Sequence, residues 1–209
     1  MADPYDSAYY EELRPTAGMA AFVDGARDRL VASQVRRLAS PGALLDVGCG
    51  QGDLLARFGD GWDLHGLERS EEGLRRARER VPTARLAAAD VQEGLPFDGP
   101  FGAITMINVL EHLERPSAAL AGLAAAQPAG GVLVVHLPTI GTPGQAQRYA
   151  GSYDSDPTHI FRPSGREVLG LLHDAGYDVR RHGWAPFRPF AVWSRVEWQC
   201  AFLAVAIRR

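Results

Sequence analysis

Three acidic residues stand at the ends of three successive apolar segments of the sequence. Asp46 lies near the end of the first segment, Glu68 ends the second, and Asp90 follows the third. In a sheet of parallel strands, the carboxyl ends of the strands meet at one edge, where ligands bind. A carboxylate at Glu68 can accept both hydroxyls of a ribose, and one at Asp90 can accept from an exocyclic adenine amine. The spacing therefore predicts a site for a nucleoside-bearing ligand.

Glycine recurs at alternate positions directly after the first of these acids, at Gly48, Gly50 and Gly52. Such a turn bends sharply and lets a ligand approach the backbone closely. A helix predicted from the turn to about Phe58 would direct its N–H groups at that ligand. A pyrophosphate fits poorly, because Asp46 and Asp53 would repel it. An ammonium and a sulfonium would be attracted by the same carboxylates.

Two histidines could act on a second substrate. His112 follows Glu111 just beyond a predicted fourth strand, although a helix-start residue bonded to backbone is the alternative interpretation. His159 lies in residues 138–163, which show little periodicity and are long for a plain connector. A cation site at Asp154, Asp156 and His159 lacks a further clustered ligand, so no metal is expected.

Alternating strands and helices must position these residues. Strands are expected at about 43–47, 63–68, 84–89, 101–107, 132–137, 177–184 and 202–207, and helices at about 19–38, 70–81, 117–126 and 164–175. Ser70 is a good N-cap and Gly176 a good C-terminal residue for two of these helices. The alternation predicts an α/β fold with a doubly wound sheet, in one domain of residues 1–209.

Composition narrows the class of protein. The 209 residues are 46% hydrophobic and 22% charged, as expected of a globular domain, and the net charge of −3 disfavours a nucleic-acid partner. The two cysteines, Cys49 and Cys200, form no metal pair or disulfide framework, which fits a reducing compartment. Neither a signal peptide nor a membrane span is visible, so a cytoplasmic location is expected.

Several of these segments resemble the motifs of one family. Residues 45–52, Leu-Asp-Val-Gly-Cys-Gly-Gln-Gly, resemble motif I of class I S-adenosylmethionine-dependent methyltransferases. Residues 65–70 resemble motif II, and 89–91 the adenine-binding motif. Residues 108–113, Asn-Val-Leu-Glu-His-Leu, resemble a segment of the small-molecule branch that includes ubiquinone-biosynthesis O-methyltransferases. The resemblance covers most of residues 40–184.

The resemblance implies a Rossmann-like, seven-stranded, mostly parallel sheet whose last strand is antiparallel. It implies S-adenosyl-L-methionine as cofactor, S-adenosyl-L-homocysteine as product, and methyl transfer to a small molecule by in-line displacement. The cofactor-binding residues that it implies are Asp46, Gly48, Cys49, Gly50, Gly52, Leu67, Glu68, Arg69, Asp90, Val91 and Asn108. Asp46 would reach the methionine ammonium, Glu68 the ribose, and Asp90 with Val91 the adenine.

The acceptor side is less sharply predicted. Residues 156–159, Asp-Pro-Thr-His, resemble a segment that closes the acceptor side in small-molecule and sugar-linked methyltransferases, which favours His159 and His112 as catalytic residues. Residues 1–40 are interpreted as a helical lid, and the aromatic-rich residues 185–209 as an acceptor wall or a homodimer interface. The predicted acceptor-binding residues are Tyr5, Tyr9, Tyr10, Arg14, Tyr153 and Trp184, which favour an aromatic or sugar-linked acceptor.

The atom that is methylated stays open at this point. A hydroxyl needs a general base, which the two histidines could supply, whereas a neutral amine does not. O-methylation is therefore placed ahead of N-methylation. Two other classes of protein are alternatives. One is a catalytically silent methyltransferase-like binding subunit, and the other is a nicotinamide-dependent oxidoreductase, which the acids around the glycine turn disfavour.

Overall fold

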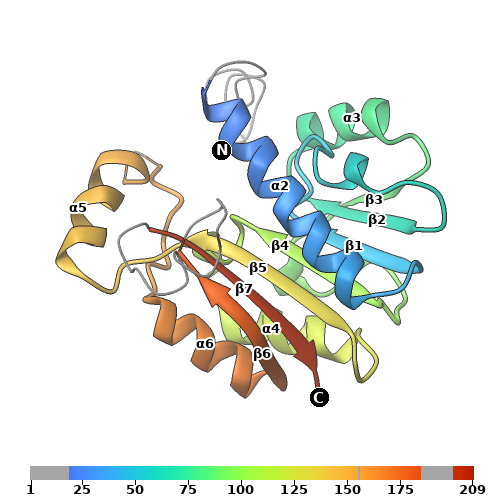
Figure 1. Cartoon of the computed structure of the whole chain (residues 1–209). Coiled ribbons are helices and arrows are strands. Elements are labelled where there is room, and N and C mark those ends of the chain that lie inside the picture. Colours follow the sequence, from blue (N-terminus) through green and yellow to red (C-terminus); the bar gives the residue numbers. More distant parts are fainter. Residues whose placement is uncertain (1–18, 155, 185–199) are drawn as a thin grey trace.

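A seven-stranded sheet forms the centre of the computed structural model, which describes residues 19–154, 156–184 and 200–209 (Figure 1). The strand order is β3-β2-β1-β4-β5-β7-β6. The strands are β1 (Ala43–Val47), β2 (Asp63–Glu68), β3 (Arg85–Ala88), β4 (Ala103–Ile107), β5 (Val132–Pro138), β6 (Tyr177–Gly183) and β7 (Ala201–Arg208). Pairing is parallel from β3 to β5, and β7 runs antiparallel to both β5 and β6. The predicted doubly wound sheet with an antiparallel last strand is confirmed.

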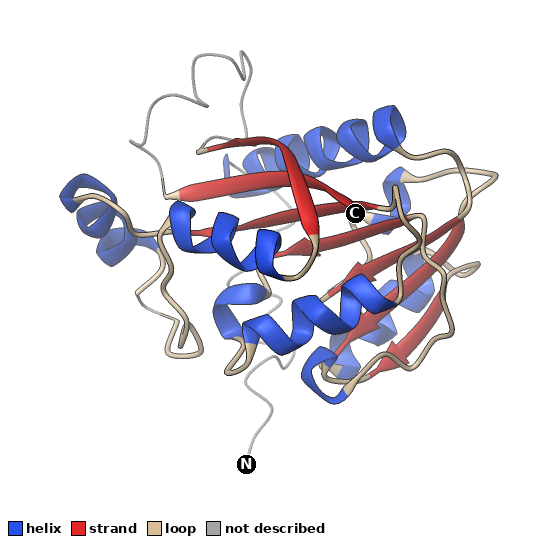
Figure 2. Ribbon diagram, turned by 90° about the horizontal axis from the view of Figure 1, so that it is seen from below, coloured by secondary structure: helices blue, strands red, loops and turns tan. Residues whose placement is uncertain are grey.

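Helices cover both faces of this sheet (Figure 2). The α-helices are α2 (Met19–Leu38), α3 (Glu71–Arg80), α4 (Pro116–Ala125), α5 (Pro143–Ser152) and α6 (Gly165–Asp174). Short 3₁₀ turns are η1 (Leu55–Arg57), η2 (Val91–Glu93) and η3 (Leu110–His112). None of the helices in the described part of the chain has the length and apolarity that a bilayer crossing requires.

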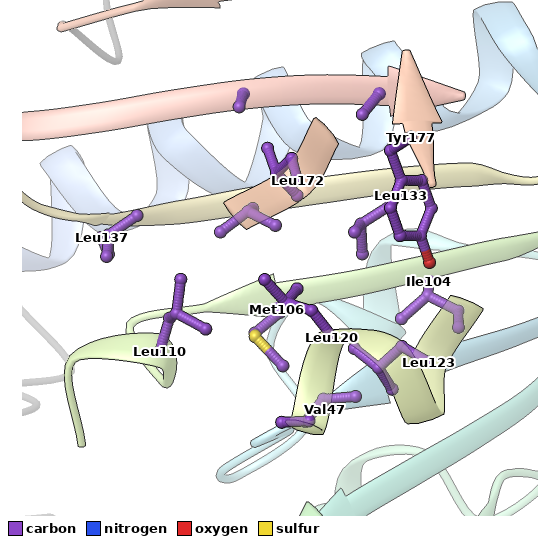
Figure 3. Packing of buried hydrophobic residues seen from close by; sticks show 14 of the residues in the cluster. Val47, Ile104, Met106, Leu110, Leu120, Leu123, Leu133, Leu137, Leu172 and Tyr177 are labelled. Atoms are coloured by element: carbon purple, nitrogen blue, oxygen red, sulfur yellow. The ribbon is translucent and has the colours of Figure 1, made fainter. Parts of the chain in front are cut away.

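Two apolar cores lie on opposite faces because strand side chains alternate. Leu45 and Val47 point to the face that α4 and α6 cover, whereas Leu44 points to the face of α2 and α3. Figure 3 shows Met106 of β4 facing Leu120 of α4 within the first core. These buried contacts fix the strands, and with them the residues at the strand ends.

The predicted helix-end residues Ser70 and Gly176 lie at helix ends, and a further cap is found at Ser164. The Ser70 hydroxyl accepts a hydrogen bond from the Gly73 N–H at 3.1 Å and begins α3. Ser164 and Glu167 form a reciprocal capping box at the start of α6. Gly176, with φ of +89°, follows the end of that helix.

Two local predictions are wrong. The glycine turn is not followed by an α-helix to Phe58, but by turns and the three-residue η1. Gly50 and Gly52 have positive φ, so few residues remain for a helix before Gly59, and nucleation is unfavourable at that length. Residues 138–163, in turn, contain the unpredicted helix α5, which stands apart from the other helices in Figure 1.

Candidate active site

A pocket opens where the strand order reverses, beside the carboxyl ends of β1 and β4. Its empty space, including solvent at the open mouth, is about 640 Å³. The lining residues are Val47, Gly48, Gly50, Leu67, Glu68, Arg69, Ala89, Asp90, Val91, Asn108, Val109, His112 and Leu113. The structure thus brings together most of the residues that the sequence predicts for a cofactor.

Glu68 ties the glycine turn to the start of α3. Its Oε2 accepts from the Gly50 N–H at 2.9 Å, and its Oε1 accepts from the N–H groups of Arg69 at 2.7 Å and Ser70 at 2.9 Å. Three backbone donors therefore fix the orientation of one carboxylate at the pocket wall. A carboxylate held in this way can accept from a ligand diol without reorganising.

Gly48 shows why the turn requires glycine. Its φ is +71°, and a Cβ at this position would lie 2.3 Å from Cγ2 of Val109. Both the backbone conformation and the close approach of the loop after β4 exclude a side chain. The glycine at position 48 therefore keeps the two strand ends close on either side of the pocket.

Three of the predicted cofactor residues lie behind the pocket wall instead of lining it. Asp46 is buried and accepts from the Thr105 hydroxyl of β4 at 2.7 Å. Cys49 packs its sulfur toward Gly66 of β2, and burial raises the pKa of its thiol well above the ordinary value. Gly52 packs close to α3. Their contacts support the shape of the turn.

Asn108 occupies a strained position at the end of β4. Its φ is +54°, which is uncommon for a residue other than glycine. Its N–H donates to the His136 carbonyl at 2.7 Å, and its side-chain Oδ1 accepts from Nδ1 of His136 at 2.9 Å. Burial, together with the charge of Arg27, lowers the pKa of His136 to about 3, so this imidazole is neutral. His136 is thus a structural support for the end of β4.

Asp90 and Arg69 also line the pocket and lie next to each other. Asp90 caps η2 by accepting from the Gln92 N–H at 2.9 Å. Arg69 Nη1 lies 3.7 Å from the second carboxylate oxygen of Asp90. The pair places a hydrogen-bond acceptor and a guanidinium plane side by side, which suits an adenine ring and its amine.

The two candidate catalytic histidines meet beside this pocket. The ring centroids of His112 and His159 are 4.7 Å apart. His112 Nδ1 lies 3.1 Å from the Thr158 carbonyl oxygen and 2.9 Å from the Thr158 hydroxyl, which in turn donates to Asp156. His159 Nδ1 lies 3.1 Å from the Tyr149 hydroxyl. Burial is the main cause that lowers the pKa of each ring.

Glu111, which was not among the predicted site residues, joins this pair. Its side chain is fully buried, and one ligand atom each of Glu111, His112 and His159 lie within 4.8 Å of one another. Its carbonyl accepts from the Phe161 N–H at 2.9 Å, so the two loops are bonded to each other. An acid directly before His112 in an otherwise apolar run is the signal that could have indicated it.

The predicted acceptor residues fall in different places. Tyr153 stacks near His159, with 6.2 Å between ring centroids. Trp184 is buried against Phe202 and donates to the Thr139 hydroxyl, so it belongs to the core instead of the pocket lining. Tyr5, Tyr9, Tyr10 and Arg14 lie outside the described residues, as does most of the aromatic part, 185–199. The lid and the dimer interface therefore stay predictions.

A second hollow adjoins the first and shares Arg69, Asp90 and His112 with it. It continues past Thr158 to the exposed Ile160, and its wall also carries Glu93, Glu114 and Arg115. Charged groups of both signs therefore line the space next to the pocket.

Comparison with known proteins identifies the family. Residues 19–182 match the family model described as "Methyltransferase domain", and the chain belongs to this family of methyltransferases. It is an S-adenosylmethionine-dependent methyltransferase. The residues present fit that cofactor, because Glu68 is fixed to accept a diol, Asp90 also lines the pocket, and the glycine turn leaves room for close approach.

Individual relatives agree with this assignment. The chain is 29% identical over 221 residues to dTDP-3-amino-3,4,6-trideoxy-alpha-D-glucopyranose N,N-dimethyltransferase of Streptomyces venezuelae, covering 99% of this chain and 90% of the relative. It is 36% identical over 119 residues to trans-aconitate 2-methyltransferase of Afipia carboxidovorans, covering 54% of this chain and 44% of that protein. An S-adenosylmethionine-dependent methyltransferase of Clostridium acetobutylicum has the same fold, with a TM-score of 0.72, 11% identity and 96% of each chain covered.

Proposed function

We propose that this methyltransferase methylates an oxygen atom of a small polar molecule, which binds in the hollow beside the cofactor pocket. S-adenosylmethionine supplies a methyl group on a sulfonium, which a nucleophile displaces in line. The methyl group is already activated, so the chain's own task is to position the acceptor and to assist the loss of its proton.

The observation that carries this proposal is the placement of His112. The residue lines both the cofactor pocket and the adjoining hollow. Because the Thr158 carbonyl can only accept, Nδ1 of the neutral ring carries the hydrogen, and Nε2 presents a lone pair. A hydroxyl requires such a group near the reaction, whereas a neutral amine does not.

The lining of the hollow supports a polar acceptor. Arg69 and Arg115 can bind an anionic or hydroxyl group, and Glu93 and Glu114 can accept from hydroxyls. A sugar-linked acceptor fits this lining, whereas nothing in the described wall offers an aromatic ring for stacking apart from His112. The net charge of −3 gives no basis for binding a nucleic acid.

A second candidate is methylation of an amine. The name of the Streptomyces venezuelae relative, which covers nearly the whole chain, states that it is an N,N-dimethyltransferase of an amino sugar nucleotide. An amine would use the hollow for binding and would not need the lone pair of His112.

Paired acceptors test the proposal. Methyl transfer from labelled S-adenosylmethionine would be measured with hydroxylated and aminated forms of the same sugars and sugar nucleotides, with mass spectrometry to locate the methyl group. We expect the hydroxyl forms to react, and His112→Gln to lower kcat by about 10²–10⁴. His173→Gln, at an exposed histidine of α6, is the matched control. Methylation of the amines alone, unchanged in His112→Gln, would establish the second candidate instead.

A further inference from the structure

Glu111, His112 and His159 form a group of one carboxylate and two imidazoles whose ligand atoms lie within 4.8 Å of one another. Two imidazoles and one carboxylate are the protein ligands of many catalytic sites for Zn²⁺ and related divalent ions. We propose that these three residues bind a divalent transition-metal ion, for which Zn²⁺ is the best match.

The outer contacts of the two rings favour this interpretation. In protein metal sites, a ligating histidine donates its other ring N–H to an oxygen, which fixes the tautomer and the ring orientation. Here Nδ1 of His112 faces the Thr158 carbonyl at 3.1 Å, and Nδ1 of His159 faces the Tyr149 hydroxyl at 3.1 Å. Nε2 is then the ring atom that each histidine would present to the ion.

Charge and burial agree with a cation. The Glu111 side chain is fully buried, and a carboxylate in such a place is stabilised by a positive charge close to it. Asp156 adds a second acid at the rim, with Oδ2 at 3.8 Å from Nε2 of His159. The nearby cation Arg162 is engaged elsewhere: its guanidinium reaches Asp154 at 2.7 Å, lies over the Tyr149 ring and donates to the His159 carbonyl at 3.3 Å.

The ligands are held by two loops that are joined to each other. Glu111 and His112 belong to η3 after β4, and His159 belongs to the loop after α5. Hydrogen bonds from the Phe161 N–H to the Glu111 carbonyl, and from His112 to Thr158, connect the loops. The site is therefore preorganised by main-chain contacts and does not depend on long, mobile side chains.

The ion would face the place where the acceptor binds. His112 borders both the cofactor pocket and the polar hollow, and three protein ligands leave a coordination position open. This role rests on the proposed function but changes how the proton is lost: with Nε2 of His112 bound to the ion, the ion instead of a free imidazole lone pair would acidify an acceptor hydroxyl at the open position, and the proton would pass to water. The acceptor oxygen then forms a bond to the methyl carbon, while the carbon–sulfur bond breaks and leaves its electron pair on sulfur.

Calorimetric titration of the metal-free chain with Zn²⁺, without cofactor, tests the site directly. We expect one ion per chain, and an affinity at least about 100-fold lower in Glu111→Gln and in His159→Asn. Tyr149→Phe removes only the outer contact of His159 and should weaken binding about 10- to 100-fold. Visible absorption of the Co²⁺-loaded chain reports the same ligands independently, and circular dichroism shows that each variant is folded.

His173→Asn is the matched control, because His173 and Asp174 form an exposed histidine–acid pair on α6. Unchanged Zn²⁺ affinity in Glu111→Gln and His159→Asn, loss of binding in His173→Asn instead, or no saturable binding would overturn the proposal. If Zn²⁺ does not bind but the chelator-treated chain still methylates hydroxyls, the metal site fails while the proposed function stands. If Zn²⁺ binds and only amines are methylated, the site stands and the proposed function fails.

Discussion

The rings of His112 and His159 stand 4.7 Å apart, although one follows β4 and the other follows α5. Thr158 connects them, because it accepts from His112 and precedes His159 in the chain. The hollow beside the pocket is therefore bordered by two loops in contact, whereas the pocket itself is lined largely by residues at the ends of neighbouring strands.

Glu68→Gln should weaken binding of S-adenosylhomocysteine roughly 10- to 100-fold. The substitution removes the negative charge that three backbone N–H groups stabilise. The glutamine amide also places an NH₂ donor against these N–H donors, where the carboxylate has acceptor oxygens only. Calorimetry of the purified variant measures the change. Glu79→Gln, at an exposed acid of α3 paired with Arg75, is the control and should bind normally. Equal affinities of the two variants would contradict the role of Glu68.

Gly48→Ala should lower the free energy of unfolding by at least about 1–2 kcal/mol, the usual cost of a left-handed conformation for a residue with a Cβ. The contact with Val109 adds to this cost and pushes the pocket walls apart, so cofactor affinity should fall as well. Urea denaturation and calorimetry measure the two effects. Gly59→Ala, whose Cβ would meet open space, should change neither. A variant as stable as the parent chain would refute the predicted strain.

Stability should decrease as the pH falls because of His136. Its native pKa of about 3 lies below the ordinary value of 6.5, so between these values the unfolded chain binds a proton that the native chain does not. Between about pH 7.5 and pH 5.5, this difference in proton binding lowers the free energy of unfolding by roughly 1.4 kcal/mol. Urea denaturation at both pH values should show a drop that is smaller by this amount in His136→Gln. The exposed His173→Gln should keep the full drop, and an equal drop in all three proteins would disprove the assignment.

Thr158→Ala should lower kcat about tenfold with little effect on the KM for the cofactor, because the hydroxyl that orients His112 toward the hollow is lost while the carbonyl remains. Thr158→Ser keeps the hydroxyl and should retain most of the activity. Steady-state kinetics of the two variants separates positioning from folding. A rise in KM at constant kcat, or a serine variant as impaired as the alanine variant, would count against a positioning role.

Much of this structure follows from local sequence. Apolar runs interrupted by glycine and proline predict the strands, and the acids at their ends, Glu68 and Asp90, line the pocket as their spacing requires. Ser70 marks a helix start because its side chain caps the helix that directly follows it, and Gly176 marks a helix end because glycine readily adopts a positive φ. These features depend on neighbours within a few residues, which a single sequence contains.

Other features depend on contacts between distant segments. Helix α5 contains Gly144 and Gly151, which weaken the helical pattern, and its Tyr149 becomes buried only in the folded chain. The Thr142 cap followed by Pro143 is the start signal that could have predicted it. Glu111 gains its place beside His159 only when two loops meet, so its position directly before His112 is the one local signal for it, and the contact with His159 is not visible in the sequence. Trp184 was predicted to bind the acceptor because it is aromatic, but its side chain is buried in the hydrophobic core.

The position of β7 between β5 and β6 has a consequence for the order in which the molecule can assemble during synthesis. Strands β1 to β4, which carry the cofactor-side residues, emerge from the ribosome in the order in which they can pair. Strand β6 emerges before β7, although β7 is the strand that connects β6 to β5 in the sheet. Until β7 is made, β5 has an unpaired edge, which can pair with other chains. The N–H of Thr139, after β5, also has its hydrogen-bond acceptor, the Cys200 carbonyl, only after Cys200 has been synthesised. The half of the sheet that carries the cofactor pocket can therefore form early, whereas the half beyond β5 is completed by residues 201–208.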